Sequence, residues 1–512
     1  MNTVLTVLCT VLCCVAYTVS LIKFTHFFQL NSYRAALQFK WIKSNSAKLF
    51  PNIFLGAFAL FGAFYTNIAG YIICISASVL AILTSLPKKA KKPLVYTMRV
   101  KRLLITSFVV LALSLTVGFF LGNITMASAT CFILCPFIIL LANLINKPLE
   151  NAIVNYYIND AKKLLSSSNA KVIGITGSYG KTSVKYYLST LLKAKYNVLM
   201  TPESYNTPMG VVKTIRSSLN AFHEIFVCEM GAKRVGEIKE ICDIVYPEIG
   251  IITSVGPQHL ETFKSLDNVK KTKFELADSL PDGGVLFLNG DDENINSFKG
   301  TRQNISYSLN GNGAYNASDI KITDKGTTFT VTAPNGEKGE FTTKLIGTHN
   351  VLNITGAIAV SHSLGIDFNL LKAQVAKLKS VPHRLELVPR GKDIIIDDAY
   401  NSNPSGTKAA LETLSYFDGF KILLTPGMVE LGEKQAELNR EFGKNAAKVC
   451  DYVILVGRSQ TEPIAKGLAD ASYPQDKIYI ASDFNEAINH AYALTCQEKK
   501  IILLENDLPD NY

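Results

Sequence analysis

The sequence predicts an α-helical transmembrane region followed by two α/β domains: a central one with a mainly parallel sheet and a smaller, Rossmann-like one. Three observations lead to this fold class. Residues 1–150 contain long apolar stretches without charge, and from residue 171 short apolar strands alternate with helical patterns. A proline interrupts the pattern within 378–388, and a second strand–helix series follows. We therefore expect domains at 1–150, 151–380 and 381–512.

The positive charge of the chain is concentrated in its first part. The formal net charge is +10, but residues 1–150 hold thirteen Lys and Arg against a single acid, Glu150. The rest of the chain carries 39 bases against 41 acids. This balance argues against nucleic acid as a partner, because a nucleic-acid-binding domain presents a basic face. The ten cysteines form no C-x-x-C pair, so buried thiols of a reducing compartment are expected.

Five membrane spans are expected in the first domain. An uncharged apolar stretch of about 20 residues is enough to cross a bilayer as a helix. The expected spans are 4–22, two within 50–86 that turn at Thr66 and Asn67, 103–121 and 126–145. A cleaved signal peptide is the alternative for the first span, but no basic segment precedes it and no small-residue cleavage site is evident.

Two basic loops determine the expected topology. Residues 23–49 and 87–102 carry most of the Lys and Arg of the first domain, whereas the turns between the other spans are uncharged. The positive-inside rule then places the N-terminus outside and everything after residue 146 in the cytoplasm. We expect a multi-pass protein of the cell membrane with cytoplasmic α/β domains. The basic residues either attract anionic lipid or contact a phosphate-bearing lipid substrate, and both interpretations stay open.

The α/β part contains two series of expected strands. The first series is 171–176, 197–200, 224–229, 249–254 and 284–288. Helical patterns separate these strands, which favours a parallel sheet. Residues 303–345 change to short segments with Asn and Gly turns, which we interpret as an antiparallel flap or side sheet, and 350–364 as a helix. The second series is 393–397, 420–425, 452–456, 476–480 and 500–504.

The segment KVIGITGSYGKTSVKYY (171–187) predicts a nucleotide site. A buried strand leads into the small-residue turn Thr176–Gly180, and a helix follows from Lys181. Such a turn aims backbone N–H groups at a phosphate chain, while Lys181 would reach the β- and γ-phosphates and Thr182 would hold Mg²⁺. The strict spacing G-x-x-x-x-G-K-[ST] is not met, because Ile175 occupies the first glycine position. A generic strand–turn–helix with an incidental lysine is the alternative.

Further candidate residues follow the next strands. Glu229 ends a buried strand at the sheet edge where a second Mg²⁺ ligand belongs. His259 follows a later strand and could complete a metal site on that edge. A surface carboxylate and a structural histidine are the alternatives. Lys273 lies in the helix that follows, for which a solvated helix face is the simplest interpretation.

Eight motifs within residues 171–460 resemble the Mur ligase family, and most closely its MurF branch, the UDP-N-acetylmuramoyl-tripeptide–D-alanyl-D-alanine ligases. They occur in the order and spacing of that family. The motifs are Thr176-Gly-Ser-Tyr-Gly-Lys-Thr, Glu229-Met-Gly-Ala, His259-Leu-Glu, Lys273-Phe-Glu, Asn289-Gly-Asp-Asp, Gly347-Thr-His-Asn, Arg384-Leu-Glu and Asp397-Asp-Ala-Tyr-Asn-Ser-Asn-Pro. The segment PGMVELG (426–432) also matches.

The resemblance implies an ADP-forming carboxylate–amine ligase that uses ATP and Mg²⁺ and works through an acyl-phosphate. Catalytic roles would fall to Lys181, Lys273, His259 and Arg384. ATP would contact Thr176, Gly177, Ser178, Gly180, Lys181, Thr182, Ser183, Asn289, Asn350, Arg384 and Asp397. The expected Mg²⁺ ligands are Thr182, Glu229 and His259, and the expected substrate residues are Asp398, Tyr400, Asn401 and Asn403. Lys273 resembles the lysine that the family carbamylates.

The chain departs from the MurF pattern at three places. Apolar spans stand where the family has a uridine-nucleotide-binding domain, Asn439 stands where a His is usual, and the chain ends LLENDLPDNY where a Lys-Gly-Ser-Arg-like end is typical. The expected partners are the lipid bilayer, a cell-wall precursor that is soluble or lipid-linked, and D-Ala-D-Ala or a similar amino acid or dipeptide. The alternatives are the same chemistry on another lipid-linked acceptor, an ATP-binding scaffold and, with little support, a transporter.

Overall fold

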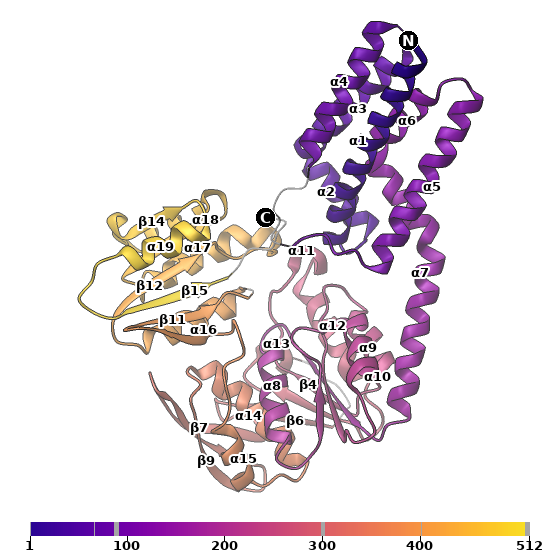
Figure 1. Cartoon of the computed structure of the whole chain (residues 1–512). Coiled ribbons are helices and arrows are strands. Elements are labelled where there is room, and N and C mark those ends of the chain that lie inside the picture. Colours follow the sequence, from indigo (N-terminus) through magenta and orange to yellow (C-terminus); the bar gives the residue numbers. More distant parts are fainter. Residues whose placement is uncertain (1, 66, 87–91, 298–302, 401, 507–512) are drawn as a thin grey trace. The chain divides into compact units, whose positions relative to one another are not determined.

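The computed structural model describes residues 2–65, 67–86, 92–297, 303–400 and 402–506. The chain divides into two units, Met1–Tyr156 and Tyr157–Tyr512. Figure 1 shows the elements of both. Part of the expected turn at Thr66, part of the basic loop 87–102, Asn401 and the last six residues lie outside the described residues. The predicted fold class, apolar helices followed by mixed α/β structure with two sheets, is confirmed.

The first unit consists of helices. They are α1 (Asn2–Leu30), α2 (Ala35–Ser44), α3 (Ser46–Phe64), α4 (Ile68–Ser85), α5 (Met98–Phe120), α6 (Ile124–Ile133) and α7 (Cys135–Ser166), the last of which continues into the second unit. Within the described residues, α1, α4, α5 and α7 are long and apolar enough to cross a membrane, and α3 and α6 contribute shorter apolar helices. Among the described residues four helices thus reach this length where the sequence predicted five spans, and the first of the two spans expected within 50–86 corresponds to the shorter apolar helix Leu49–Phe64 of α3.

The expected span at 126–145 is not one continuous helix, because two helices meet there. Helix α6 ends at Ile133 after ten residues, and α7 begins at Cys135. Pro136 lies in the first turn of α7 and has no N–H to donate back to α6, which explains why the helix restarts at this point. Ten residues are too few to cross a bilayer.

Small residues and buried hydroxyls hold the first unit together. A Cβ on Gly62 of α3 would lie 2.5 Å from the carbonyl oxygen of Gly70 in α4, so the two backbones are in close contact. The hydroxyl of Tyr17 in α1 donates to the carbonyl oxygen of Ser107 in α5 at 2.9 Å. Apolar helices gain little by associating in lipid, so such contacts give this unit its specific packing.

The second unit begins with a nine-stranded sheet in the order β2-β3-β1-β4-β5-β6-β7-β8-β9. The strands are β1 (Lys171–Thr176), β2 (Val198–Met200), β3 (Ile225–Glu229), β4 (Ile249–Ile252), β5 (Val285–Asn289), β6 (Asn304–Ser308), β7 (Tyr315–Thr323), β8 (Gly326–Thr332) and β9 (Lys338–Thr343). Neighbours from β2 to β7 run parallel, and β7, β8 and β9 are antiparallel. The expected antiparallel pairing within 303–345 is present in β7, β8 and β9, but these strands do not form a separate flap or side sheet. Strand β6 extends the parallel part and the hairpins continue the same sheet.

Helices cover both faces of this sheet. They are α8 (Lys181–Leu192), α9 (Pro208–Ser218), α10 (Glu237–Val245), α11 (Leu260–Phe263), α12 (Leu266–Asp278), α13 (Glu293–Asn296), α14 (Thr348–Ser363) and α15 (Phe368–Val375). Val172 of β1 packs with residues of α9, α10 and α12 on one face, whereas Ile173 and Ile175 pack with α8, α14 and α15 on the other. Burial on both faces explains the nearly continuous apolar runs of the parallel strands.

A six-stranded sheet follows, in the order β10-β11-β15-β12-β13-β14. Its strands are β10 (Glu386–Arg390), β11 (Asp393–Asp398), β12 (Phe420–Thr425), β13 (Tyr452–Val456), β14 (Ile478–Ala481) and β15 (Lys500–Glu505). Its helices are α16 (Pro404–Ser415), α17 (Gln435–Ala446), α18 (Arg458–Asp470) and α19 (Phe484–Ala493). The five expected strands are present. The sequence analysis missed β10, an antiparallel edge strand that contains Pro389, a residue that sheets tolerate at their edges.

Candidate functional site

The glycine loop follows β1 and is fixed against the chain after β4. Gly177 and Gly180 have positive φ, and a Cβ on Gly177 would overlap the hydroxyl of Thr253. Ser178 N–H donates to the carbonyl oxygen of Ser254 at 2.8 Å, and the Tyr179 hydroxyl donates to Pro257 at the same distance. The loop is thus held in one shape by groups that lie beneath it, which suits a cradle for an anion.

Two hydroxyls predicted to contact a nucleotide are used within the protein. Thr176 Oγ1 donates to the carbonyl oxygen of Met230 at 3.0 Å, and Ser178 Oγ donates to that of Gly256 at 3.0 Å. Ser183 lies on the first turn of α8 and hydrogen-bonds with the side chain of Tyr187. The N–H groups of Ser178 and Tyr179 are also bonded to Ser254, so the Lys181 side chain and the other N–H groups of the loop are its candidates for binding an anion.

Lys181 folds back over the loop. Its Nζ donates to the carbonyl oxygens of Gly177 at 2.7 Å and Ser178 at 3.1 Å. Burial lowers the pKa of Lys181 to about 8, the carboxylate of Glu229 opposes this shift, and the guanidinium of Arg384 adds to it. The ammonium group has neutral carbonyl partners that a phosphate oxygen can replace.

Thr182 and Glu229 come together as the sequence predicted. Glu229 ends β3 opposite Ile175 of β1, which places its carboxylate beside the start of the glycine loop. Thr182 Oγ1 donates to Glu229 Oε1 at 3.1 Å, and Asn206 Nδ2 donates to the same oxygen at 2.9 Å. Lys185 Nζ lies 3.1 Å from Glu229 Oε2, and both side chains are almost completely buried. The carboxylate therefore has its own counter-charge inside the protein.

Lys273 is buried without a partner. It is 1% exposed, and within the described residues its Nζ has no hydrogen-bond partner. Burial holds the pKa of this amine well below its ordinary value, and the nearby Lys181 lowers it further. The simplest sequence interpretation, a solvated helix face, is wrong, because α12 turns this residue toward the interior. A buried, unpaired amine with a lowered pKa loses its proton more readily than an ordinary lysine and is then nucleophilic.

His259 pairs with a carboxylate from the second sheet. Its Nδ1 lies 2.5 Å from Glu430 Oε2, and Lys233 approaches the other oxygen of Glu430 at 3.4 Å. The bond to His259 lowers the pKa of Glu430 to about 2, while burial lowers the pKa of His259. His259 has a left-handed backbone (φ 49°) at the start of α11, so its position is set by the turn as well as by the pair.

Asn289 and Asn350 are both engaged in the fold. Asn289 donates to the carbonyl oxygen of Thr253 at 3.0 Å and accepts from the N–H of Asp291. Asn350 accepts from the Tyr187 hydroxyl at 2.7 Å and donates to Ile346 at 2.8 Å. Each amide closes a turn near the candidate nucleotide site, and each is buried.

Arg384 and Asp397 lie in the part of the chain that forms the second sheet. The guanidinium of Arg384 stacks 4.2 Å above the ring of Tyr400. Asp397 Oδ2 bonds His383 Nδ1 at 2.8 Å, and its other oxygen accepts from the N–H of Ala399. Asn403 caps α16 by accepting from Gly406 N–H at 2.8 Å, so this predicted substrate residue has a structural partner.

Asp398 and Glu505 form a buried carboxyl pair at the ends of β11 and β15. The two residues are opposite each other in the strand register. Ser402 Oγ donates to Glu505 Oε1 at 2.6 Å, and Leu385 N–H donates to Asp398. Burial raises the pKa of Asp398 to about 6 against the opposing effect of Arg384, and burial followed by repulsion from Asp398 raises the pKa of Glu505 well above its ordinary value. The pair therefore retains a proton where two isolated carboxylates would have none.

Two sequence profiles match the second unit. The profile of the Mur ligase middle domain matches residues 175–361, and that of the Mur ligase, glutamate ligase domain matches residues 383–505. Together they cover both sheets and more than half of the chain. The chain belongs to the Mur ligase family.

Individual relatives carry the MurF name. The UDP-N-acetylmuramoyl-tripeptide–D-alanyl-D-alanine ligase of Escherichia coli K12 is 34% identical over 295 residues, which are 56% of this chain and 65% of that protein. The Bacillus subtilis protein of the same name is 31% identical over 286 residues, 55% of this chain and 62% of that protein. The chain thus spans less than two thirds of either relative. The MurF ligase of Thermotoga maritima in complex with ADP superimposes with a TM-score of 0.63 at 27% identity, over 69% of this chain and 80% of that one.

One departure from the Mur ligase pattern has a structural role. Asn439 in α17 is buried, accepts from the N–H of Met428 at 2.8 Å and donates to the carbonyl oxygen of the same residue at 2.9 Å. A primary amide can donate and accept at once along a backbone, and here it fixes the PGMVELG loop that carries Glu430.

Three charged residues of the Mur ligase site were missed in the sequence. Lys185 lies one helical turn after Lys181, so the i, i+4 spacing alone places both lysines on one face of α8. Glu505 ends an apolar strand as Glu229 does, and the same pattern would have found it. No local sequence pattern would have identified Glu430, because it contacts His259 only in the folded protein.

Proposed function

We propose that this Mur ligase is a membrane-anchored, ATP-dependent, ADP-forming carboxylate–amine ligase of the MurF type. It adds D-alanyl-D-alanine, or a similar amino acid or dipeptide, to the peptide of a cell-wall precursor. The observation that carries the proposal is the convergence of Lys181, Thr182 and Glu229 at the ends of β1 and β3. The names of the relatives supply the substrate class.

The proposed reaction has two steps. The carboxylate of the acceptor peptide attacks the γ-phosphate of ATP, which gives an acyl-phosphate and releases ADP. The amine of the incoming substrate then attacks the acyl carbon, loses a proton and displaces phosphate. Both steps depend chiefly on positioning and on neutralising charge. Lys181 supplies a cation beside the glycine loop, and Arg384 lies close enough to influence the pKa of Lys181.

The donor set fits Mg²⁺ at Thr182 and Glu229. A hydroxyl and a carboxylate oxygen 3.1 Å apart are hard oxygen donors of the kind that this ion prefers. When bound, Mg²⁺ would neutralise phosphate charge. His259 fits this role less well, because its Nδ1 is bonded to Glu430 and it offers a nitrogen through Nε2 alone.

Lys273 fits a carbamate. The amine is buried, unpaired within the described residues and has a lowered pKa. Its nitrogen can attack CO₂ and lose a proton, which converts a neutral amine into an anion. That anion would lie near Lys181, whose charge already influences the pKa of Lys273. We propose this modification for the active enzyme.

Membrane anchoring is the second part of the proposal. Within the described residues, four helices of the first unit have the length and composition of spans. The proposal keeps the five expected crossings, with α3 crossing before α4 and α6 continued by the first part of α7. Both basic loops then lie on the inner side and the second unit is cytoplasmic, where ATP is present.

ADP release by the detergent-solubilised protein tests the proposal. D-alanyl-D-alanine is supplied with soluble UDP-muramoyl-tripeptide in one arm and with its undecaprenyl-linked counterpart in the other, and the Lys181→Ala protein is the blank. We expect acceptor-dependent ADP release in at least one arm. Release in the second arm alone assigns a lipid-linked acceptor. No release in either arm, from protein that still binds ATP, would contradict MurF-type ligation and leave an ATP-binding scaffold.

A further inference from the structure

A pocket of about 510 Å³ lies within the first unit. The turn between α1 and α2 contributes Tyr33, α2 contributes Phe39, and the first turn of α5 contributes Arg99. One long face of α7 forms the remaining wall. The pocket has no place in the ligation chemistry described above, because all its lining residues precede the second unit.

The wall formed by α7 changes character along the helix. Leu140, Leu144, Lys147 and Asn151 follow one another at intervals of three or four residues, so they share one face. The first two positions are apolar and the last two are polar. A ligand that lies along this wall therefore meets hydrocarbon at one end and a charged group at the other.

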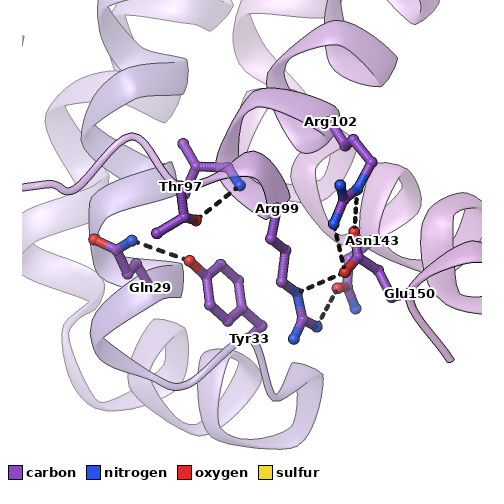
Figure 2. Close-up of polar contacts among 8 residues, drawn as sticks. Gln29, Tyr33, Thr97, Arg99, Arg102, Asn143 and Glu150 are labelled. Carbon is purple, nitrogen blue, oxygen red and sulfur yellow. Dashed lines mark hydrogen bonds and ion pairs between the residues drawn. The ribbon is translucent and has the colours of Figure 1, made fainter. Parts of the chain in front are cut away.

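The charges around the pocket do not cancel. Arg102 binds both carboxylate oxygens of Glu150, at 2.6 and 3.0 Å, and so balances this acid (Figure 2). Arg99 is 4.0 Å from Glu150, donates to Asn143 at 3.4 Å and stacks 4.2 Å above the Tyr33 ring. Lys147 is exposed on the same wall. Arg102 thus neutralises Glu150, and two further cations, Arg99 and Lys147, line the pocket.

The position of these cations along the spans matches a lipid headgroup. Arg99 is the second residue of α5, and Tyr33 lies just beyond the end of α1 at Leu30. Lys147 is the first charged residue of α7 after its apolar first part. All three therefore lie where apolar helix gives way to polar chain, on the side that the basic loops mark as cytoplasmic.

We infer that this pocket binds a membrane lipid with a phosphate headgroup. The phosphate lies against Arg99 and Lys147, whose guanidinium and ammonium groups are the donors that such a group attracts. The hydrocarbon chain lies along Leu140 and Leu144. The inference rests on the membrane insertion proposed above and does not depend on ligation. It gives the first unit a binding function in addition to anchoring.

Lipid binding by the full-length protein in phosphatidylcholine nanodiscs tests the inference. The probes are labelled phosphatidic acid and undecaprenyl phosphate, with labelled diacylglycerol as the uncharged comparison and excess inorganic phosphate as the competitor. Lys147→Gln removes a charge from an exposed side chain, so the fold is not at risk. We expect it to weaken binding of a phosphate-bearing probe about fivefold, and Arg99→Gln/Lys147→Gln to weaken it about 20-fold or more.

Lys101→Gln is the matched control, because Lys101 is an exposed cation on α5 that does not line the pocket. It should bind the probes as the unaltered protein does. Equal weakening by Lys101→Gln and Lys147→Gln would show general surface attraction and overturn the inference. Equal binding of diacylglycerol would overturn it as well, and displacement by inorganic phosphate would assign the site to the free anion. Because no turnover is measured, these outcomes are independent of the ligase assay.

Discussion

Glu229 and Glu505 occupy equivalent places in two sheets and have opposite surroundings. Each ends a buried parallel strand, β3 or β15, after an apolar run, and each is at most 1% exposed. Glu229 lies 3.1 Å from the ammonium of Lys185. Glu505 lies opposite Asp398, and burial with this second carboxyl raises its pKa well above the ordinary value.

The difference shows that the partner, and not the position in the fold, decides what a strand-terminal acid can do. A carboxylate balanced by a lysine accepts a hydrogen bond from Thr182, and its oxygen is the donor that we propose for Mg²⁺. A carboxyl that shares its site with another keeps a proton and acts as a hydrogen-bonding group. The two sheet edges therefore differ in charge: the end of β3 carries a lysine–carboxylate pair, and the end of β15 carries a carboxyl pair that holds a proton.

The largest effect on ligation is expected from removing Lys181, the cation beside the glycine loop at the end of the sheet where Glu229 lies. Lys181→Ala should lower ADP release about 10³-fold or more, because the charge beside the phosphates is lost. Lys193→Ala is the matched control, since Lys193 is an exposed residue at the end of the same helix. Initial rates of ADP formation make the comparison. Full turnover by Lys181→Ala would remove the glycine loop from the mechanism.

Breaking the Glu229–Lys185 pair tests the balance of charge directly. Glu229→Gln leaves a buried ammonium without its carboxylate, so the free energy of unfolding should fall by about 3–5 kcal/mol. Adding Lys185→Met should restore most of that stability without restoring ligation. Urea unfolding measures both variants. Glu248→Gln, which breaks a half-exposed pair with Lys171, should change stability by about 1 kcal/mol or less. An equal loss of stability in Glu229→Gln and Glu248→Gln would contradict the interpretation that burial makes the Glu229–Lys185 pair the more important one.

The carbamate that we propose for Lys273 would add a second anion near Lys181. Lys273→Ala should lower ADP release about 10²-fold, and short-chain carboxylates added to the assay should recover part of the rate. Recovery is expected because a small acid can occupy the space that the side chain leaves. Matched chloride salts control for ionic strength. If no carboxylate restores activity, Lys273 acts as a structural lysine.

The smallest effect is expected for the carboxyl pair Asp398–Glu505 at the ends of β11 and β15, where the free energy of unfolding should depend on pH. The folded protein keeps Asp398 protonated up to about pH 6, whereas the ordinary pKa is 3.8. The folded state then binds more protons than the unfolded chain, so stability falls as pH rises from about 4 to about 6. Glu505→Gln removes the second titrating carboxyl and should flatten this dependence. Thermal unfolding midpoints across this range, differing by a few degrees, measure it. An unchanged slope in Glu505→Gln would show that Glu505 does not contribute to this pH dependence.

The sequence was sufficient where local patterns determine structure. The strands of both parallel series, the loop Gly177–Gly180 and the acid at the end of β3 follow from apolar runs and turn residues. Pro136 was also visible in the sequence, but the apolar stretch continues through it, and for that reason 126–145 was expected to be one span where the structure has two helices.

Long-range contacts account for what the sequence did not reveal. Nothing near Lys273 indicates that its amine points into the interior without a partner, because that depends on how α12 packs. His259 and Glu430 are 171 residues apart, and only the placement of the two sheets within the second unit joins them. The pairing of β6 with β7 is also a contact that the sequence pattern does not reveal. The alternation of apolar and polar residues can indicate a strand, but it does not tell which other strand it pairs with.

The joint between the parallel and antiparallel parts of the first sheet has a consequence for amide hydrogen exchange. Strand β6 pairs with β7 at Tyr307–Tyr315 and Ser308–Asn316, whereas β7 and β8 pair along most of their length. Helix α14 packs across the joint, and Gly356 lies so close to the Tyr307 ring that a Cβ would be 2.9 Å from its Cζ. Helix α14 therefore bridges a short region of strand pairing. We expect the backbone amides of the parallel and antiparallel parts of the sheet to exchange hydrogen as two separate cooperative units. Opening of β7–β9 then leaves the backbone that holds the nucleotide edge protected.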